Sequence, residues 1–428
     1  MKTGIIILSF LIIIYFISCD TNEPPVEKAK LLLKLEDASC TEAWITLTTN
    51  NLLLPTTVTL KQFNPTGDTI SQILSLNTQD SLLYINSLLP NQTYQYQASS
   101  IQNPATSNEL SVTTMDTTSH EFTFQTWTFG EHDASFLWDV AIIDENNIWA
   151  VGEIYMNDSL GQPDPKAYNA IYWDGTQWEL RRIDMLSSCN PIIYPPLNAI
   201  WIFSENSIVV TSGGSVGWFD GITNIPDCNI MPLLTGTINK IWGSRSDDLY
   251  FVGNAGNIVR YNGTWARIES GTETRINDVW GIISKENKTI LYCPVSSFFV
   301  PGDKKILKVI DGRVDSVYWN RDVRLYSAWA VNENILYVCG EGTYVNKFGV
   351  WNEIDLYPVG TNSVRGNGSN DIFIVGDAGA IFHFNGVSWK MLSTPNNKSY
   401  SKVAIKGNLV VICGYYQGKG LIEIGNRN

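Results

Sequence analysis

Side chains suited to acid–base or metal chemistry are scarce in this sequence. The 428 residues include three histidines, His120, His132 and His383, and no two of them stand at a spacing typical of a metal site. No serine occupies a Gly-x-Ser-x-Gly turn, and no phosphate-binding loop is present. We therefore predict no metal, no cofactor and no catalytic residue, and we expect His383 to be packed or exposed without partners.

Two carboxylates and two guanidinium groups remain as candidates for polar chemistry. Asp139 and Asp278 stand beside recurring apolar strands, and a carboxylate pair held about 5–10 Å apart can hydrolyse a glycosidic bond. Aspartate is also common where strands begin, and this structural interpretation is the favoured one. Arg245 and Arg365 belong to similar strands and could contact an anion near the centre of the fold.

Aromatic side chains recur in and beside long irregular segments, which cover residues 153–167, 184–197, 294–304 and 415–419. Function concentrates on loops that a rigid scaffold carries, and aromatic side chains there suit a glycan or a protein partner. The alternative is that these side chains only pack their own loops. The candidate binding residues are Tyr155, Tyr194, Phe298, Phe299, Trp319, Tyr415 and Tyr416.

A repeat that begins near residue 120 must position these side chains. Segments such as "INKIWGSRSDDLYFVGN" (238–254) contain a short apolar strand, a polar turn and a second strand that ends near glycine. Seven such units occur, and most are separated by the roughly 40–50 residues of a propeller blade. Their anchor residues are Trp138, Trp201, Trp242, Trp280, Trp329, Arg365 and Ala404. The repeat predicts an all-β fold with a seven-bladed β-propeller of four-stranded blades.

Turn chemistry supports this reading. Asp174-Gly175, Asn262-Gly263 and Asn385-Gly386 each precede a tryptophan by a few residues. Two-residue hairpin turns need positive φ at both central residues, and Asp-Gly or Asn-Gly provides it at little cost. We expect such turns between the third and fourth strands, with Trp178, Trp265 and Trp389 on the outer strands.

The last unit is one strand short, because the chain reaches residue 428 soon after its third strand. Upstream, "HEFTFQTWTFG" (120–130) is a single alternating strand that carries Trp127. We expect this strand to close the ring as the outer strand of the last blade, since an unpaired sheet edge invites mispairing.

A four-stranded meander separates its connections onto two faces. The first–second and third–fourth turns lie on one face, which we call the turn face. The second–third loops and the links between blades lie on the other face, which we call the insertion face. All four long irregular segments belong to the insertion face, so their aromatic side chains are expected on one rim.

Residues 30–117 have a different organisation, with short alternating runs separated by turn residues. The segment "LLPNQTYQYQ" (88–97) contains Leu88, Pro90 and Tyr94 in a pattern that resembles the tyrosine corner of fibronectin type III domains. The resemblance implies a two-sheet sandwich with Trp44 in its core. Such a domain implies a spacer or a binding module.

The N-terminal segment "MKTGIIILSFLIIIYFISCD" contains an apolar run of signal-peptide length, too short for a membrane span. It ends in "FISC", which resembles the lipobox of bacterial lipoproteins, although Phe16 stands where leucine is usual. The resemblance implies cleavage before Cys19 and lipidation of its thiol. An ordinary cleaved signal or a membrane anchor is the alternative. The polar, proline-bearing residues 20–30 suit a tether.

Six further cysteines need an interpretation. Cys189 and Cys228 fall in long loops and could form a disulfide. Cys293, Cys339 and Cys413 replace a buried valine in equivalent strands of different units, which lie too far apart to bridge, so we interpret them as small apolar residues. We expect Cys40 to be single.

Together these patterns predict a signal peptide (1–18), a lipidated tether (19–29), a fibronectin type III-like domain (30–117) and a seven-bladed propeller (118–428). The net charge of −13, with no basic cluster, argues against nucleic acid as a partner. The resemblance implies a bacterial cell envelope protein, lipid-anchored on the periplasmic or cell-surface side. We expect a non-catalytic binding or scaffolding module with a protein or glycan ligand. The alternatives are a carbohydrate-active hydrolase or lyase and an assembly factor for envelope complexes.

Overall fold

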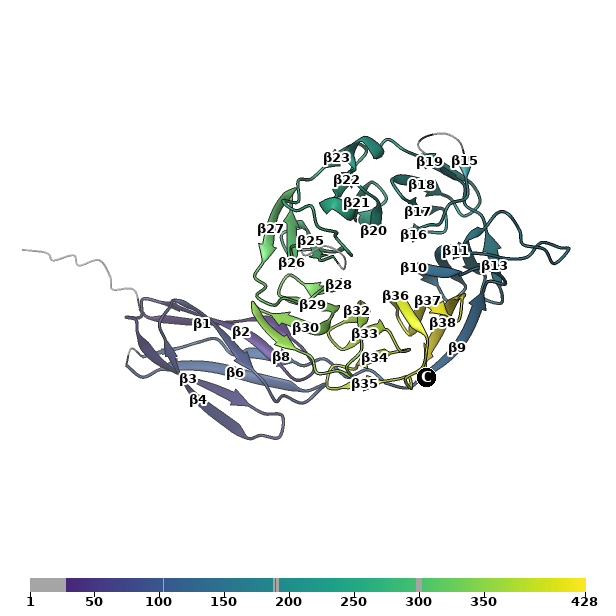
Figure 1. Ribbon diagram of the computed structural model, residues 1–428. Helices are drawn as coiled ribbons and strands as arrows, with labels where there is room; N and C mark the ends of the chain where they lie inside the picture. The colour runs from purple at the N-terminus through teal and green to yellow at the C-terminus, as the bar shows by residue number, and fades with distance from the viewer. Residues whose placement is uncertain (1–27, 103, 188, 190–191, 298–301) are drawn as a thin grey trace, which may run out of the picture. The chain divides into compact units, whose positions relative to one another are not determined.

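The computed structural model describes residues 28–102, 104–187, 189, 192–297 and 302–428 (Figure 1). These residues form two compact units. Residues 28–38, 43–86 and 93–113 belong to the first unit, and residues 39–42, 87–92 and 114–428 to the second. No helix among the described residues is long and apolar enough to span a membrane. The predicted signal peptide, Cys19 and the first residues of the tether lie outside the described residues.

The first unit contains two antiparallel sheets. One sheet has the order β1-β2-β5, and its strands are β1 (Lys30–Ala38), β2 (Ala43–Asn50) and β5 (Asp80–Ile85). In the other sheet, β3 pairs with β4 and β6, and β6 also pairs with β7 and β8. Its strands are β3 (Thr56–Phe63), β4 (Thr69–Leu76), β6 (Thr93–Ser100), β7 (Ala105–Thr106) and β8 (Leu110–Thr113). Trp44 and Tyr94 are both buried, as expected, while the fibronectin type III assignment stays a prediction.

The second unit contains seven four-stranded antiparallel sheets among its described residues, which confirms the predicted propeller. Blade 1 is β10 (Phe136–Asp144), β11 (Asn147–Ile154), β12 (Tyr168–Trp173) and β13 (Trp178–Arg181). Blade 2 is β16 (Ala199–Ser204), β17 (Ser207–Ser212), β18 (Ser215–Phe219) and β19 (Asn224–Asp227). Blade 3 is β20 (Ile238–Arg245), β21 (Asp248–Gly253), β22 (Ile258–Tyr261) and β23 (Trp265–Arg267). Blade 4 is β24 (Trp280–Ile283), β25 (Thr289–Val295), β26 (Lys305–Ile310) and β27 (Arg313–Val317).

The remaining blades have the same order. Blade 5 is β28 (Leu325–Asn332), β29 (Ile335–Gly340), β30 (Gly342–Lys347) and β31 (Val350–Glu353). Blade 6 is β32 (Thr361–Gly368), β33 (Asp371–Gly376), β34 (Ile381–Phe384) and β35 (Trp389–Met391). Between blades lie the small hairpin β14 (Met185–Leu186) and β15 (Ile192–Ile193) and the 3₁₀ turn η1 (Met231–Leu233), while a second 3₁₀ turn, η2 (Asn254–Gly256), follows β21. Figure 1 shows first strands such as β10, β16 and β20 nearest the centre of the ring.

Blade 7 confirms the predicted closure. It consists of β36 (Ser399–Lys406), β37 (Leu409–Tyr416), β38 (Lys419–Arg427) and β9 (Phe122–Phe129), in that order. Strand β9 pairs antiparallel with β38 along its whole length, with Trp127 opposite Ile422. Trp127 then packs on Trp173 and Trp178 of blade 1, at ring-centroid distances of 5.4 and 6.2 Å. The closing strand therefore joins the last blade to the first through apolar contacts as well as hydrogen bonds.

A recurrent glycine allows each first strand to lie close to the second. Five of the second strands have glycine at equivalent positions: Gly152, Gly253, Gly340, Gly376 and Gly414. A Cβ atom built on any of them would lie 1.9–2.1 Å from a carbonyl oxygen at the start of the first strand. Only glycine fits such an approach, which explains why these repeats end on that residue.

The hairpin turns differ from the expected two-residue type. Trp173 pairs with Trp178 and Phe384 with Trp389, so four residues separate the strands there. Positive φ occurs only at the glycines, such as 93° at Gly175. In blade 1 the side-chain oxygen of Asp174 accepts hydrogen bonds from the backbone N–H groups of residues 176 and 177. The carboxylate therefore closes a wider turn, in which one residue with positive φ is enough.

Candidate functional site

The backbone pairing of the first strands shows which residues occupy equivalent positions in different blades. Backbone pairing aligns Asp139 with Lys240, because Asp139 lies opposite Val151 and Lys240 opposite Val252. Trp138 is therefore not the equivalent of Trp242, and the predicted anchor in blade 1 is wrong. Ala141 occupies the anchor position, because it pairs with Trp149 as Trp242 pairs with Tyr250.

Two successive positions near the start of the first strand of each blade align in this way, and we name them by their place. The mouth position, on the insertion face, is occupied by Trp138, Asn198, Asn239, Asn277, Tyr326, Asn362 and Ser401. The belt position follows it and is occupied by Asp139, Ala199, Lys240, Asp278, Ser327, Ser363 and Lys402. The pairing register shifts between these positions in blades 1, 3, 5, 6 and 7. Bulges of this kind redirect side chains and are common beside functional sites.

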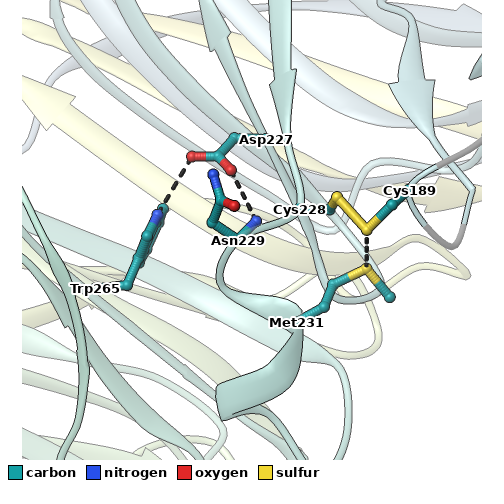
Figure 2. The surroundings of a disulfide bond; sticks show 6 residues. All are labelled: Cys189, Asp227, Cys228, Asn229, Met231 and Trp265. Carbon is teal, nitrogen blue, oxygen red and sulfur yellow. Dashed lines mark hydrogen bonds between the residues drawn. A yellow bond between two sulfur atoms is a disulfide. The ribbon is translucent and has the colours of Figure 1, made fainter.

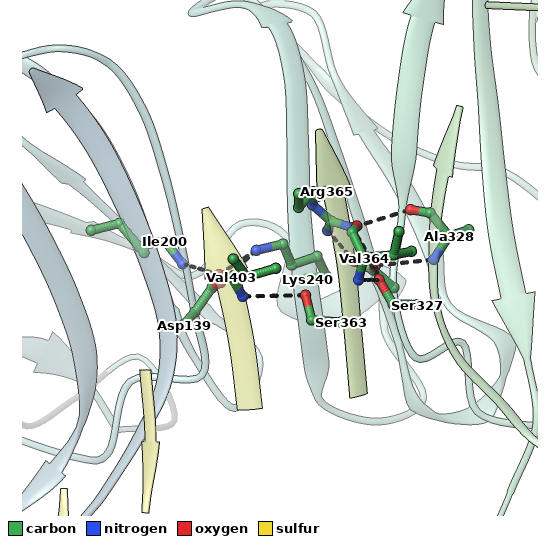
Figure 3. Close-up of polar contacts among 10 residues, drawn as sticks. Asp139, Ile200, Lys240, Ser327, Ala328, Ser363, Val364, Arg365 and Val403 are labelled. Atoms are coloured by element: carbon green, nitrogen blue, oxygen red, sulfur yellow. Dashed lines mark hydrogen bonds and ion pairs between the residues drawn. The ribbon is translucent and has the colours of Figure 1, made fainter. Parts of the chain in front are cut away.

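Belt side chains link several blades to the next one (Figure 3). The backbone N–H of Ile200 in blade 2 donates to Asp139 of blade 1 at 3.0 Å. The same relation continues from Val364 to Ser327 at 3.2 Å and from Val403 to Ser363 at 3.3 Å. These oxygen atoms satisfy buried N–H groups that would otherwise face the channel without a partner.

Both candidate carboxylates are held in buried ion pairs within this belt. Lys240 Nζ lies 2.5 and 2.6 Å from the two carboxylate oxygens of Asp139. Arg365 donates to both oxygens of Asp278, at 3.0 and 2.9 Å. Burial favours the neutral form of Asp278, but the charges of Arg365 and Lys402 outweigh it and hold the pKa of this carboxyl well below its usual range. Burial lowers the pKa of Lys240, although Asp139 opposes the shift.

Arg365 is engaged on every side. Its guanidinium also donates to Ser327 Oγ at 3.0 Å and to the carbonyl of Ala328 at 3.2 Å, and it lies 4.9 Å from the ring centroid of Trp280. The structure does not bring Arg245 to the same place. Arg245 lies at the turn-face end of β20, where it is exposed and pairs with Asp247.

Asparagines at the mouth position also bridge neighbouring blades. Asn239 Nδ2 donates to the carbonyl of Ile276, and Asn277 Nδ2 to the carbonyl of Leu325, at 2.9 and 2.8 Å. Asn362 continues the pattern, because its Nδ2 donates to the carbonyl of Tyr400 in blade 7 at 2.9 Å. Sequence reasoning missed these residues, although the repeated "IN", "LN" and "TN" dipeptides three residues before the anchor were the available signal.

A cavity of about 430 Å³ opens on the insertion side of the belt, and every blade contributes to it. Its lining is Trp138, Asn198, Asn239, Arg275, Asn277, Ser296, Ser297, Tyr326, Asn362, Ser401 and Lys402. None of the described residues that line this cavity is a carboxylate. Arg275 and Lys402 form no ion pair with any residue that the structure describes, and desolvation lowers the pKa of Arg275. The volume is in the range of ligand pockets.

A second, smaller cavity of about 160 Å³ lies on the turn side of the belt. Apolar residues of the first strands dominate its lining, together with Trp201, Trp280 and the cations Lys240 and Arg365. Because the belt lies between the two cavities along each first strand, it separates them into two compartments with different chemistry.

The predicted rim aromatics are placed unevenly. Tyr415 stacks on Phe136 with ring centroids 4.5 Å apart, and Phe136 stacks on Trp138 at 5.1 Å. Trp319 instead packs on outer-strand residues of blade 5, with its ring centroid 4.9 Å from that of Trp351. Only Tyr415 is therefore linked to the cavity by contacts that the structure records.

The other rim candidates have local partners. Tyr155 donates to Glu153, Tyr194 lies under the ammonium of Lys166 at 5.9 Å, and Tyr416 packs into the core between blades 6 and 7. Phe298 and Phe299 lie outside the described residues. Whether any of these side chains binds a ligand stays a prediction.

His383 differs from the expectation of no partners. It is buried in blade 6, where its Nε2 lies 2.9 Å from Asp371 and its Nδ1 lies 2.8 Å from Nδ1 of His120. Arg427 of the closing blade also donates to Asp371. Desolvation, followed by the neighbouring His383, lowers the pKa of His120. Among the described residues, no cluster of three or more potential metal ligands occurs.

A disulfide joins Cys189 to Cys228, with Cα atoms 5.6 Å apart (Figure 2). It connects the link between blades 1 and 2 to the end of blade 2, and Met231 Sδ lies 3.5 Å from Cys189 Sγ. Nearby, Asp227 accepts a hydrogen bond from Trp265 of blade 3 at 3.2 Å. The other described cysteines, Cys40, Cys293, Cys339 and Cys413, are free and buried. Burial raises the pKa of the Cys339 thiol to about 12, as suits an inert packing residue.

Comparisons with known proteins give no family for this chain. No protein-family model matches it, and no curated protein matches it. Among solved structures, it is similar to YCF48 from Cyanidioschyzon merolae, with 12% identity over 70% of this chain and 98% of that one and a TM-score of 0.49.

Two further solved structures are similar. BamB from Moraxella catarrhalis has 10% identity over 72% of this chain and 98% of that one, with a TM-score of 0.37. A quinoprotein alcohol dehydrogenase-like protein from Bacteroides thetaiotaomicron has 11% identity over 93% and 96%, with a TM-score of 0.36. At these values the likenesses carry no argument about function, and the propeller assignment rests on the seven sheets.

Proposed function

We propose that this chain is a binding module of the bacterial envelope, anchored by lipid on Cys19, which recognises a protein or glycan at the insertion-side cavity. One observation carries the proposal: all seven blades contribute to a cavity of about 430 Å³ that contains polar groups and two cations that form no ion pair with a described residue. Ligand sites are typically concave and contain a few polar groups that converge on the ligand.

The two carboxylates that best suited a hydrolase are poorly placed for catalysis. Asp139 and Asp278 are buried and paired with Lys240 and Arg365. A general acid for glycoside cleavage needs a raised pKa, whereas the pKa of Asp278 is lowered. Their hydrogen bonds to the next blade support a structural role instead.

Binding should therefore depend on the mouth residues. We would display the full chain on a glycan array and use it as bait for envelope proteins, in parallel with the variants Trp138→Ala and Tyr326→Ala. The matched control is Ile222→Ala, which removes an exposed apolar side chain from a turn-face loop of blade 2. A ligand retained by the control and lost by both mouth variants supports the proposal. A stable protein partner with this profile would favour the role of an assembly factor, and equal binding by all variants would refute the site.

The anchor has a separate test. Two or three acyl chains give stable membrane attachment, since each buried methylene contributes roughly 0.8 kcal/mol. We expect Cys19→Ala to move the protein from the membrane fraction to the soluble fraction when the signal peptide is still cleaved. Retention of the variant in membranes would contradict lipidation as the anchor.

A further inference from the structure

We propose that the insertion-side cavity binds an acidic glycan, with Arg275 and Lys402 meeting its carboxylate groups and Trp138 stacking on a sugar ring. This inference rests on the proposed function, because it names the ligand class of the same cavity.

The charges of the cavity select an anion. Arg275 and Lys402 line it, and neither forms an ion pair with a described residue. In the belt beneath, Asp139 and Asp278 form ion pairs with Lys240 and Arg365, and the charge of Lys402 also acts on Asp278. Four cations, these three and Arg275, therefore share two carboxylates. The channel is thus locally positive in a chain whose net charge is −13. A focused positive site in an acidic protein attracts anions specifically to that place.

The remaining lining suits hydroxyl groups. Four asparagines and three serines face the cavity beside the two cations. Amide and hydroxyl groups both donate and accept hydrogen bonds, as sugar hydroxyls do. Three asparagine Nδ2 groups are fixed by carbonyls of the neighbouring blade, so their side chains are held in place before a ligand arrives. Asp377 accepts hydrogen bonds from Asn362 and Ser399 and is not among the described residues that line the cavity.

An aromatic stack borders the same cavity. Trp138 lines it and remains 40% exposed, although it is a large apolar side chain. Phe136 lies parallel to it, with an interplanar angle of 6°, and Tyr415 also stacks on Phe136, at 15°. The indole is thus held by a stacked ring and is itself a flat surface. The C–H face of a pyranose ring stacks on such a surface, and a rigid aromatic contact costs little conformational entropy.

The combination favours a glycan over an acidic peptide. Cations alone would serve a peptide carboxylate, but they leave the fixed amides and the supported indole unused. An acidic oligosaccharide uses all three features, since it brings carboxylates, hydroxyls and a flat C–H face together.

Calorimetric titration of the full chain in a neutral detergent tests the assignment. The probes are tri-galacturonate, tri-mannuronate and a hyaluronan tetrasaccharide, with the methyl ester of tri-galacturonate as a neutral match and hexaglutamate as the acidic peptide. We expect at least one acidic oligosaccharide to bind, and its methyl-ester or neutral form to bind at least tenfold more weakly. Arg275→Gln and Lys402→Gln should each weaken acidic binding about 10- to 100-fold, as loss of a charge-assisted hydrogen bond does. Arg313→Gln, an exposed residue paired with Asp315, is the control and should bind normally.

Several results would overturn the inference. They are failure of all three acidic oligosaccharides, equal binding of the methyl ester, tighter binding of hexaglutamate, or insensitivity to both cation variants when thermal unfolding shows them folded. Each of these results is compatible with the proposed function. The proposed function fails only if ligands found on the array or by capture bind Trp138→Ala and Tyr326→Ala as well as they bind the unchanged protein.

Discussion

Replacing Asp278 with alanine should destabilise the propeller strongly. Asp278 is fully buried, accepts two hydrogen bonds from the Arg365 guanidinium, and also accepts from Ser327 Oγ at 2.5 Å. Its loss leaves a buried guanidinium without a counter-charge, which typically costs about 3–5 kcal/mol. For a unit of this size, that corresponds to a fall in melting temperature of roughly 5–8 °C.

A double variant separates the ion pair from simple loss of packing. Blade 2 has alanine at the belt position, and blades 2 to 5 have tryptophan at the anchor position that Arg365 occupies in blade 6. Asp278→Ala with Arg365→Trp therefore uses residues that this chain already places at equivalent sites. We expect it to recover at least half of the lost free energy of unfolding, because no buried guanidinium remains without its counter-charge.

Urea unfolding followed by tryptophan fluorescence measures both variants. Asp315→Asn is the control, since its ion pair is exposed and should change stability by less than about 0.5 kcal/mol. Asp278→Asn adds a pH test: the lowered pKa of Asp278 stabilises the fold above the unfolded pKa near 4, and this contribution is lost as pH falls further. A cost below about 1 kcal/mol for Asp278→Ala, or strictly additive effects in the double variant, would refute the stabilising role of the ion pair between Asp278 and Arg365.

Three other outcomes follow from the contacts. Because burial and His383 lower the pKa of His120, the unfolded chain binds more protons than the folded one. The free energy of unfolding should therefore decrease as the pH is lowered from 7.5 to 5.5. His120→Gln should flatten this pH dependence in urea unfolding. Reducing the disulfide, or changing Cys228 to serine, opens a loop spanning 39 residues and should lower the free energy of unfolding by up to about 4 kcal/mol. A melting temperature that does not change with reductant would contradict this stabilising role. Gly253→Ala would place a Cβ atom 1.9 Å from the carbonyl oxygen of Thr237 and should cost about 1–3 kcal/mol or more in calorimetry. Ser212→Ala, in one of the two blades that lack this glycine, should cost little.

The fold was largely predictable because a propeller repeats its local signals. Alternating strands and polar turns recur in each unit and terminal glycines in most of them, so seven sheets and the closing strand could be predicted from pattern alone. Blade 1 was misaligned because Trp138 stands three residues before the true anchor position, Ala141, and imitates the tryptophan of the other units. Only the register of backbone pairing distinguishes the two positions.

The candidate site was less predictable because it forms only when the ring closes. Arg275 and Lys402 are far apart in sequence and lie in no recognisable motif, so nothing in the chain marks them as neighbours. Asp139 and Asp278 could be identified as channel residues, but their roles depend on the cations that other blades place opposite them. Burial and pairing, which the sequence does not display, turn possible acids into fixed counter-ions.

The pairing of β9 with β38 also constrains the order of events during biosynthesis. Strand β9 precedes every other propeller strand in the chain, yet its partner β38 follows all the other described strands. Six blades can assemble from consecutive segments, while β9 must wait with one edge unpaired for some three hundred residues. An unpaired strand edge invites mispairing, so this segment is at risk until β38 has been made, and the circle is sealed in a single late step.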